Sequence, residues 1–131
     1  MTVIESKVSL NKPIHEVYTF LSDLNNHQQL MPENIYNWSS TVDEARFTIQ
    51  NMAKLALKVS NRTENKEIVI VPSEQAPFAV ELKWTLNDSG NGNTEAVYTI
   101  SADLNMMMKM IASGPLQKLV NHETEQLKAV L

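Results

Sequence analysis

The stretch that decides the fold runs from residue 78 to residue 104 and reads FAVELKWTLNDSGNGNTEAVYTISADL. Both ends of it alternate apolar and polar residues, and a cluster of Asn and Gly lies between them. Alternation with a period of two places the apolar side chains on one face of a β-strand. Asn and Gly tolerate the positive φ angles of tight turns. We therefore predict strands at residues 78–86 and 94–104, joined by a hairpin loop at residues 87–93.

The segments before this hairpin repeat the period-two pattern. They predict further strands at residues 2–10, 34–40, 44–50, 52–60 and 67–71. Strands that follow one another through short loops usually pair as neighbours, so we expect an antiparallel meander.

Two segments have helical spacing instead. Asn11 is expected to cap a helix of about 13 residues with Pro13 in its first turn. Near the C-terminus, Asn105 is expected to cap a methionine-rich segment, and Gly114-Pro115 is expected to break or kink it. After this point one face carries residues at helical spacing, namely Leu116, Leu119, Val120, Glu123 and Leu127.

Together these elements predict an α+β fold for residues 1–131 as a single domain. A curved antiparallel sheet of about seven strands would wrap around a long C-terminal helix, because helices must cover the apolar face of a sheet.

Composition excludes several classes of function. The chain has no cysteine, which rules out disulfides, thiolate catalysis and zinc–thiolate sites. Its formal charge is −4 and it contains only Arg46 and Arg62 as arginines, so no basic footprint for nucleic acid is visible. No stretch approaches the length of a membrane span, and the N-terminus lacks the pattern of a signal peptide. We expect a cytoplasmic protein without stable membrane insertion.

This order of elements resembles the SRPBCC superfamily, also called START-like or polyketide-cyclase/lipid-transport proteins, and in particular its small bacterial members. The resemblance rests on the strand Ile4–Val8, on Val17–Asn26 followed by Leu30-Met31-Pro32, on Trp38, on Phe78–Trp84 and on Ala102–Asn105. It implies a helix-grip fold, a cavity between the sheet and the C-terminal helix, and apolar or aromatic ligands. It implies no universal catalytic residues.

The inward-facing positions of the strands and the last helix define a predicted cavity. Its lining is expected to be Phe47, Ile49, Leu55, Leu57, Val80, Leu82, Trp84, Tyr98, Ile100, Met107, Met110, Ile111 and Val120. Methionine side chains are flexible and polarizable, so the methionines would form either ordinary core or an adaptable pocket wall. Tyr98 is the one titratable side chain of this set. Tyr36, Trp38 and Trp84 are further aromatic strand residues with polar tips, which either complete the core or orient a ligand.

The sequence shows no catalytic or metal-binding pattern. His122-Glu123 would need a second histidine four residues on to resemble a zinc helix, and position 126 is Gln. His15, His27 and His122 are far apart in sequence, and we expect them on the surface. No metal and no cofactor is predicted.

The leading hypothesis is therefore a non-catalytic domain that binds a small hydrophobic molecule, either a lipid or a metabolite. One alternative is a cyclase- or dehydratase-like enzyme in the same cavity, which would need a charged residue or a histidine facing inward. The other is a protein-interaction module similar to the chaperone activators of this fold, which would need an exposed apolar patch. The identity of the ligand and the oligomeric state stay open.

Overall fold

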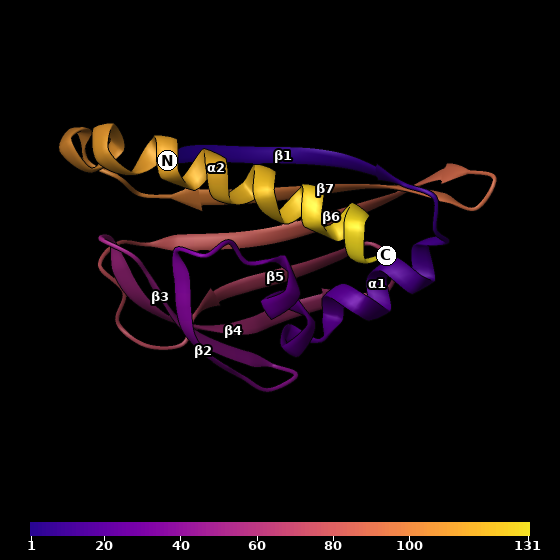
Figure 1. Cartoon of the computed structure of the whole chain (residues 1–131), viewed down its shortest axis with the longest axis horizontal. Helices are drawn as coiled ribbons and strands as arrows, with labels where there is room; N and C mark the ends of the chain where they lie inside the picture. Colours follow the sequence, from indigo (N-terminus) through magenta and orange to yellow (C-terminus); the bar gives the residue numbers. More distant parts are fainter.

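The computed structural model describes residues 1–131 and contains seven strands, two α-helices and one 3-10 helix. In chain order the elements are β1 (Thr2–Leu10), α1 (Ile14–Ser22), η1 (Leu24–Leu30), β2 (Ile35–Ser40), β3 (Glu44–Ile49), β4 (Ala53–Thr63), β5 (Glu67–Pro72), β6 (Val80–Gly90), β7 (Asn93–Ala102) and α2 (Met106–Val130). Figure 1 shows the sheet curling around α2, with α1 lying near the C-terminal end of α2. The α+β prediction is confirmed.

All seven strands form one antiparallel sheet in the order β1-β7-β6-β5-β4-β3-β2. Strands β2 to β7 follow one another as the predicted meander, and β1 pairs with β7 at the far edge. The β6–β7 hairpin is tighter than predicted, because both strands continue through most of residues 87–93. Gly90, Asn91 and Gly92 form its tip with φ angles of 89°, 56° and 76°.

The concave face of the sheet holds the hydrophobic core. Trp84 is fully buried there, and its ring stacks on that of Tyr98 on the next strand with 4.4 Å between centroids and an 11° angle between planes. Helix α2 lies across β1 and β7. The hydroxyls of Ser6 on β1 and Thr124 on α2 are 2.8 Å apart, and the Gln117 side chain donates to the Glu5 carbonyl at 3.1 Å. These contacts hold the helix along one edge of the sheet.

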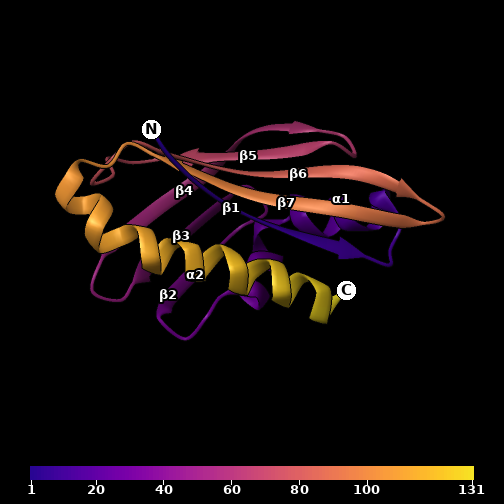
Figure 2. The same ribbon diagram turned by 90° about the horizontal axis from the view of Figure 1, so that it is seen from above.

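The helix ends differ in part from the predictions. Asn11 does not cap α1: Pro13, in an extended conformation, occupies the N-cap position and the helix has 9 residues. Asn105 does cap α2, because its side chain accepts a hydrogen bond from the Met108 N–H. Pro115 does not break α2, which continues to Val130, although Figure 2 shows its axis bending near the N-terminal end. Neither helix combines the length and hydropathy needed to cross a lipid bilayer.

The first turns of α2 project past the sheet, which makes one prediction wrong. Figure 1 shows that they extend beyond the start of β1, so no strand lies opposite them. Met107, Met110 and Ile111 are 72%, 83% and 64% exposed, and with Met106 they form a surface patch rather than cavity wall. Only their helical spacing is visible in the sequence, and the spacing does not show where the sheet ends.

Replacing Met110 with glutamine should therefore change the free energy of unfolding by no more than about 0.5 kcal/mol, as for an ordinary surface position. The same substitution at Leu127, which is fully buried on the same helix, should destabilise the protein clearly. Urea unfolding followed by circular dichroism measures both. A large loss at Met110 would show that the first turns of α2 pack against another part of the protein.

Candidate functional site

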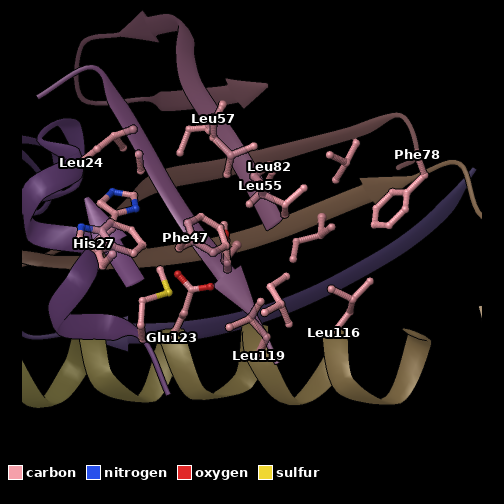
Figure 3. Close-up of a pocket in the computed structure, with 18 residues that line it drawn as sticks. Leu24, His27, Phe47, Leu55, Leu57, Phe78, Leu82, Leu116, Leu119 and Glu123 are labelled. Carbon is pink, nitrogen blue, oxygen red and sulfur yellow. The ribbon is translucent and has the colours of Figure 1, made fainter. Parts of the chain in front are cut away.

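A pocket lies between the concave face of the sheet and α2. It is lined by 18 residues, of which 16 are hydrophobic, and Figure 3 shows their side chains converging from the strands, from η1 and from α2. The volume that the centre of a water molecule can reach is only about 40 Å³. The lining residues Met31, Trp38 and Phe78 are half-buried, so the wall meets solvent at these positions. The pocket is therefore apolar, narrow and partly open.

Eight of the thirteen predicted cavity residues line this pocket. They are Phe47, Ile49, Leu55, Leu57, Val80, Leu82, Tyr98 and Ile100, all from the inward positions of β3, β4, β6 and β7. Trp84 and Val120 are fully buried but are not part of the pocket wall. The remaining three, at the start of α2, are the exposed residues described above.

Ten lining residues were not predicted. They are Leu24, His27, Met31, Trp38, Ala45, Ile70, Phe78, Leu116, Leu119 and Glu123. Several of them carried a signal in the sequence: Leu116, Leu119 and Glu123 share the predicted inner face of the last helix, and Ala45 and Phe78 begin alternating runs. Leu24 continues the helical spacing of the apolar residues of the first predicted helix. His27 and Met31 carried no signal, because the irregular segment that contains them has no period from which a direction can be inferred.

The four aromatic strand residues with polar tips lie in three different places: the pocket wall, the hydrophobic core and the protein surface. Trp38 stacks on Phe47 with 5.3 Å between ring centroids, and its Nε1 donates to the Ser40 hydroxyl at 2.9 Å. Trp38 and Tyr98 line the pocket, Trp84 does not, and Tyr36 is 45% exposed. The period-two pattern of residues 34–40 predicts that Tyr36 and Trp38 share a face. This prediction is wrong, because the register of β2 shifts between Tyr36 and Ser39, with Asn37 at a φ of 56°.

His27 is a buried wall residue, so the prediction of a surface histidine is wrong for it. Its side chain is 4% exposed, and the Nε2 atom lies 2.8 Å from the Leu21 carbonyl oxygen, to which it donates as a neutral ring. Burial lowers the pKa of His27 to about 4, against the opposing effects of that hydrogen bond and of Asp23. The ring is therefore uncharged at neutral pH.

Arg62 holds the segment that carries His27 against the sheet. From β4 it donates to the Ser22 carbonyl at the end of α1 at 2.7 Å and to the Val42 carbonyl at 3.1 Å. Its guanidinium also forms an ion pair of 2.8 Å with Asp43. One cation thus ties the end of α1 and the β2–β3 turn to β4, which supports the η1 side of the pocket.

Glu123 is the polar group in the middle of this apolar wall. It is 1% exposed, and Figure 3 shows its carboxyl group pointing from α2 into the pocket. No protein group completes a hydrogen bond with either carboxyl oxygen. Burial raises the pKa of Glu123 well above its ordinary value, and the influence of the Tyr98 hydroxyl only partly opposes this. Burial and the nearby Glu123 likewise raise the pKa of Tyr98.

The pocket therefore contains three titratable groups rather than the one predicted. At neutral pH the His27 ring is neutral, the Tyr98 hydroxyl keeps its proton, and burial favours the protonated form of Glu123. Such a site can present hydrogen-bond donors and acceptors to a molecule while offering it no positive charge.

A curved seven-stranded sheet that grips a long C-terminal helix over an apolar pocket is the helix-grip fold of the SRPBCC, or START-like, superfamily. Solved structures with this fold match nearly the whole chain. A START superfamily protein from Mycobacterium smegmatis has a TM-score of 0.68 at 16% identity, covering 98% of this chain and 99% of that one. The Aha1 dimer from Colwellia psychrerythraea has a TM-score of 0.68 at 15% identity, and the match covers 98% of this chain and 97% of that one.

The di-domain ARO/CYC protein BexL has a TM-score of 0.74 at 11% identity, covering 98% of this chain and 46% of that one. Identities this low establish the fold alone. No family model matches the sequence, and no curated protein does.

Proposed function

We propose that this protein binds a small, mostly apolar molecule in the pocket between the sheet and α2. The observation that carries the proposal is the pocket itself, with a wall that is hydrophobic at 16 of 18 residues and contains a few polar groups. Ligand sites are typically concave and apolar, with a small number of polar groups that orient the ligand. The START superfamily protein and the ARO/CYC protein among the structural neighbours support this class of function.

The size of the pocket limits the ligand. A water-accessible volume of about 40 Å³ holds a few water molecules at most. A larger guest requires side chains to rotate, and the half-buried Met31 and Phe78 at the solvent boundary are the residues best able to do so. Methionine in particular conforms to irregular apolar shapes. We therefore expect compact one-ring molecules to bind more readily than long lipid chains.

Toluene is a suitable probe, because it is compact and has no polar group. At a hundredfold excess over its dissociation constant it should stabilise the protein by about 2.7 kcal/mol, since it binds the folded state alone. A thermal shift detects this stabilisation, and the NMR signals of the Leu55 and Leu82 methyl groups in the wall should move with it.

The matched control fills the pocket. Ala45 is a buried wall residue of β3, so Ala45→Leu should abolish the effect of toluene, whereas Ala56→Leu on the other face of β4 should preserve it. Failure of toluene to shift the wild-type protein, or an unchanged shift in Ala45→Leu, would remove the proposal. Native mass spectrometry of gently purified protein is a separate test of the same proposal, because it shows directly any molecule that the pocket retains.

Glu123 favours one second candidate, a proton-transfer enzyme. A buried carboxyl group with a raised pKa, in a pocket and beside a tyrosine, is the kind of group that acts as a general acid. The corresponding reaction is the dehydration of a β-hydroxyketone. The Glu123 carboxyl group protonates the hydroxyl, which leaves as water; the carboxylate that remains takes the α proton, and the electrons of that C–H bond form the C=C bond of the enone.

β-Hydroxycyclohexanone tests this candidate. Binding without catalysis predicts that the enone absorbance grows no faster with the protein than in buffer. Turnover that is lost in Glu123→Gln, while the variant still binds toluene, would establish the enzyme in place of the binding domain.

A further inference from the structure

The hydrogen-bonding capacity of the Glu123 carboxyl group is not satisfied by the protein itself, although the Tyr98 hydroxyl lies near enough to affect its pKa. Both of its oxygens are buried and lack a protein partner, although the helix on which it lies is well packed. A buried polar group without a hydrogen bond costs stability, and such groups are uncommon in native proteins. The carboxyl points into the pocket that the proposed function assigns to a ligand (Figure 3). A hydrogen-bonding group on that ligand would supply the missing partner.

No cation is available to pair with this carboxyl or to attract an anion beside it. No lysine or arginine lines the pocket, and the two arginines are engaged elsewhere, Arg46 with Glu74 and Arg62 with Asp43. The only nitrogen base in the wall is His27, whose Nε2 is engaged with the Leu21 carbonyl. An anionic ligand would therefore lie beside the acidic side chain of Glu123 with no positive charge to offset the repulsion between them.

We propose that the pocket selects an uncharged ligand that has a compact apolar body and an oxygen acceptor, such as a ketone, which receives a hydrogen bond from the Glu123 carboxyl group. This inference rests on the proposed function and names the class of molecule that the same site takes. The Glu123 carboxyl group on α2 thereby selects the head group of the ligand, and the hydrophobic wall selects its apolar body.

The donor role follows from the chemistry of the groups present. A protonated carboxyl has one O–H donor and keeps an oxygen that can accept. The neighbouring Tyr98 hydroxyl is a donor for that oxygen, which leaves the carboxyl O–H in need of an acceptor. The alternative, an amine bound as an ion pair, requires a positive charge in this pocket. The same burial that would oppose it already lowers the pKa of His27 to about 4.

Four probes, each with a single six-membered ring, distinguish a neutral acceptor, a cation and an anion as the preferred head group. Methylcyclohexane has no head group, cyclohexanone has an acceptor, cyclohexylamine is a cation at neutral pH, and cyclohexanecarboxylate is an anion. Their affinities are measured by NMR titration on the wild-type protein, on Glu123→Gln and on Glu123→Leu. Gln keeps an N–H donor at the same place, whereas Leu has a similar volume and no donor.

We expect cyclohexanone to bind the wild-type protein and Glu123→Gln with similar affinity. In Glu123→Leu its affinity should fall about fivefold, which corresponds to about 1 kcal/mol, while methylcyclohexane binds at least as well as before. The amine and the carboxylate should bind more weakly than the ketone. An amine that binds more tightly than the ketone and loses its affinity in Glu123→Gln would overturn the proposal, and so would a ketone affinity that Glu123→Leu leaves unchanged.

The outcomes also separate this inference from the proposed function. If methylcyclohexane binds but the affinity for the ketone is the same in the wild-type protein and in Glu123→Leu, only the inference fails. If neither molecule binds any of the three proteins, both fail.

A pH titration supplies an independent readout. The titratable groups that line the pocket with Glu123 are Tyr98 on β7 and His27 on η1, while Glu5 and Lys7 of β1 are exposed on its other face. The pKa of His27 is lowered to about 4, whereas burial raises the pKa of Glu123 above its ordinary value, so a change at higher pH that Glu123→Gln removes belongs to Glu123. Ketone affinity should fall as the pH rises through the pKa of Glu123 and should stay constant in Glu123→Gln. Equal pH profiles for the two proteins would contradict the donor role.

Discussion

Replacing Trp84 with alanine should lower the free energy of unfolding by about 3–5 kcal/mol, the usual range for a core aromatic residue. Trp84 is fully buried at the centre of the sheet, between Ile68 on β5 and Tyr98 on β7. The substitution removes its stacking on Tyr98 and leaves a cavity that the surrounding strands cannot close. Because Tyr98 lines the pocket, the loss should also loosen the wall on that side.

Two variants on the same strand serve as controls. Glu81→Ala changes an exposed residue of β6 and should leave stability within about 0.5 kcal/mol of the wild-type value. Trp84→Phe keeps an aromatic ring on Tyr98 and removes an indole N–H that has no hydrogen-bond partner, so it should cost less than Trp84→Ala. Denaturant unfolding measures all three. An unchanged midpoint for Trp84→Ala would contradict the position of β6 in the centre of the sheet.

Replacing Glu123 with glutamine should make stability depend on pH through His27. The folded-state pKa of His27 is lowered from 6.5 to about 4. Between these two pH values the His27 ring is therefore protonated in the unfolded chain and neutral in the folded protein. Stability is then present above pH 6.5 and is lost as the pH falls toward 4. One proton over this interval is worth about 3 kcal/mol, at about 1.4 kcal/mol per pH unit.

In the wild-type protein Glu123 opposes this dependence. Its pKa is raised above 4.5 in the folded state, so above pH 4.5 the folded protein holds a proton that the unfolded chain has lost. Its contribution to stability is therefore present below 4.5 and is lost as the pH rises through the folded-state pKa. Above pH 4.5 and below the raised folded-state pKa of Glu123, the two slopes therefore have opposite signs, and the pH dependence caused by His27 is reduced. Glutamine does not titrate, so it leaves the slope of His27 alone.

The measurement is a series of urea unfolding curves from pH 4 to 7 on both proteins, since the surface groups common to both contribute equally. A double variant, Glu123→Gln with His27→Gln, should lose the dependence again. Parallel curves for the wild-type protein and Glu123→Gln would show that Glu123 ionises as an ordinary exposed carboxyl group does. That result would also remove the basis for its role as a donor.

The exposed start of α2 bears on the third hypothesis drawn from the sequence, a protein-interaction module. Met106, Met107, Met110 and Ile111 do form an exposed apolar patch of the kind such a module would need. All four side chains of this patch are apolar and exposed. The pocket, by contrast, contains a buried polar group that lacks a partner.

The sequence alone predicted the strands and their inward faces, because alternation is a local property of the chain. A period of two assigns Leu82 and Trp84 to one face of β6 without knowledge of any other strand. The helical spacing likewise placed Glu123 on the same face as Leu119 and Val120. The sequence therefore contained the signal for the buried carboxyl group, but the spacing alone did not show that this part of the face covers an apolar cavity.

The tertiary structure decided which inward residues meet in one place. The curvature of the sheet brings Phe47 and Tyr98 to one pocket while Trp84 stays outside its wall, and no local pattern contains that curvature. The length of α2 relative to the sheet leaves Met110 exposed while Glu123 is buried. His27 became a wall residue because η1 packs against α2, a contact between segments almost one hundred residues apart. Local periodicity determines the face of each element, whereas burial depends on what the rest of the chain places opposite that face.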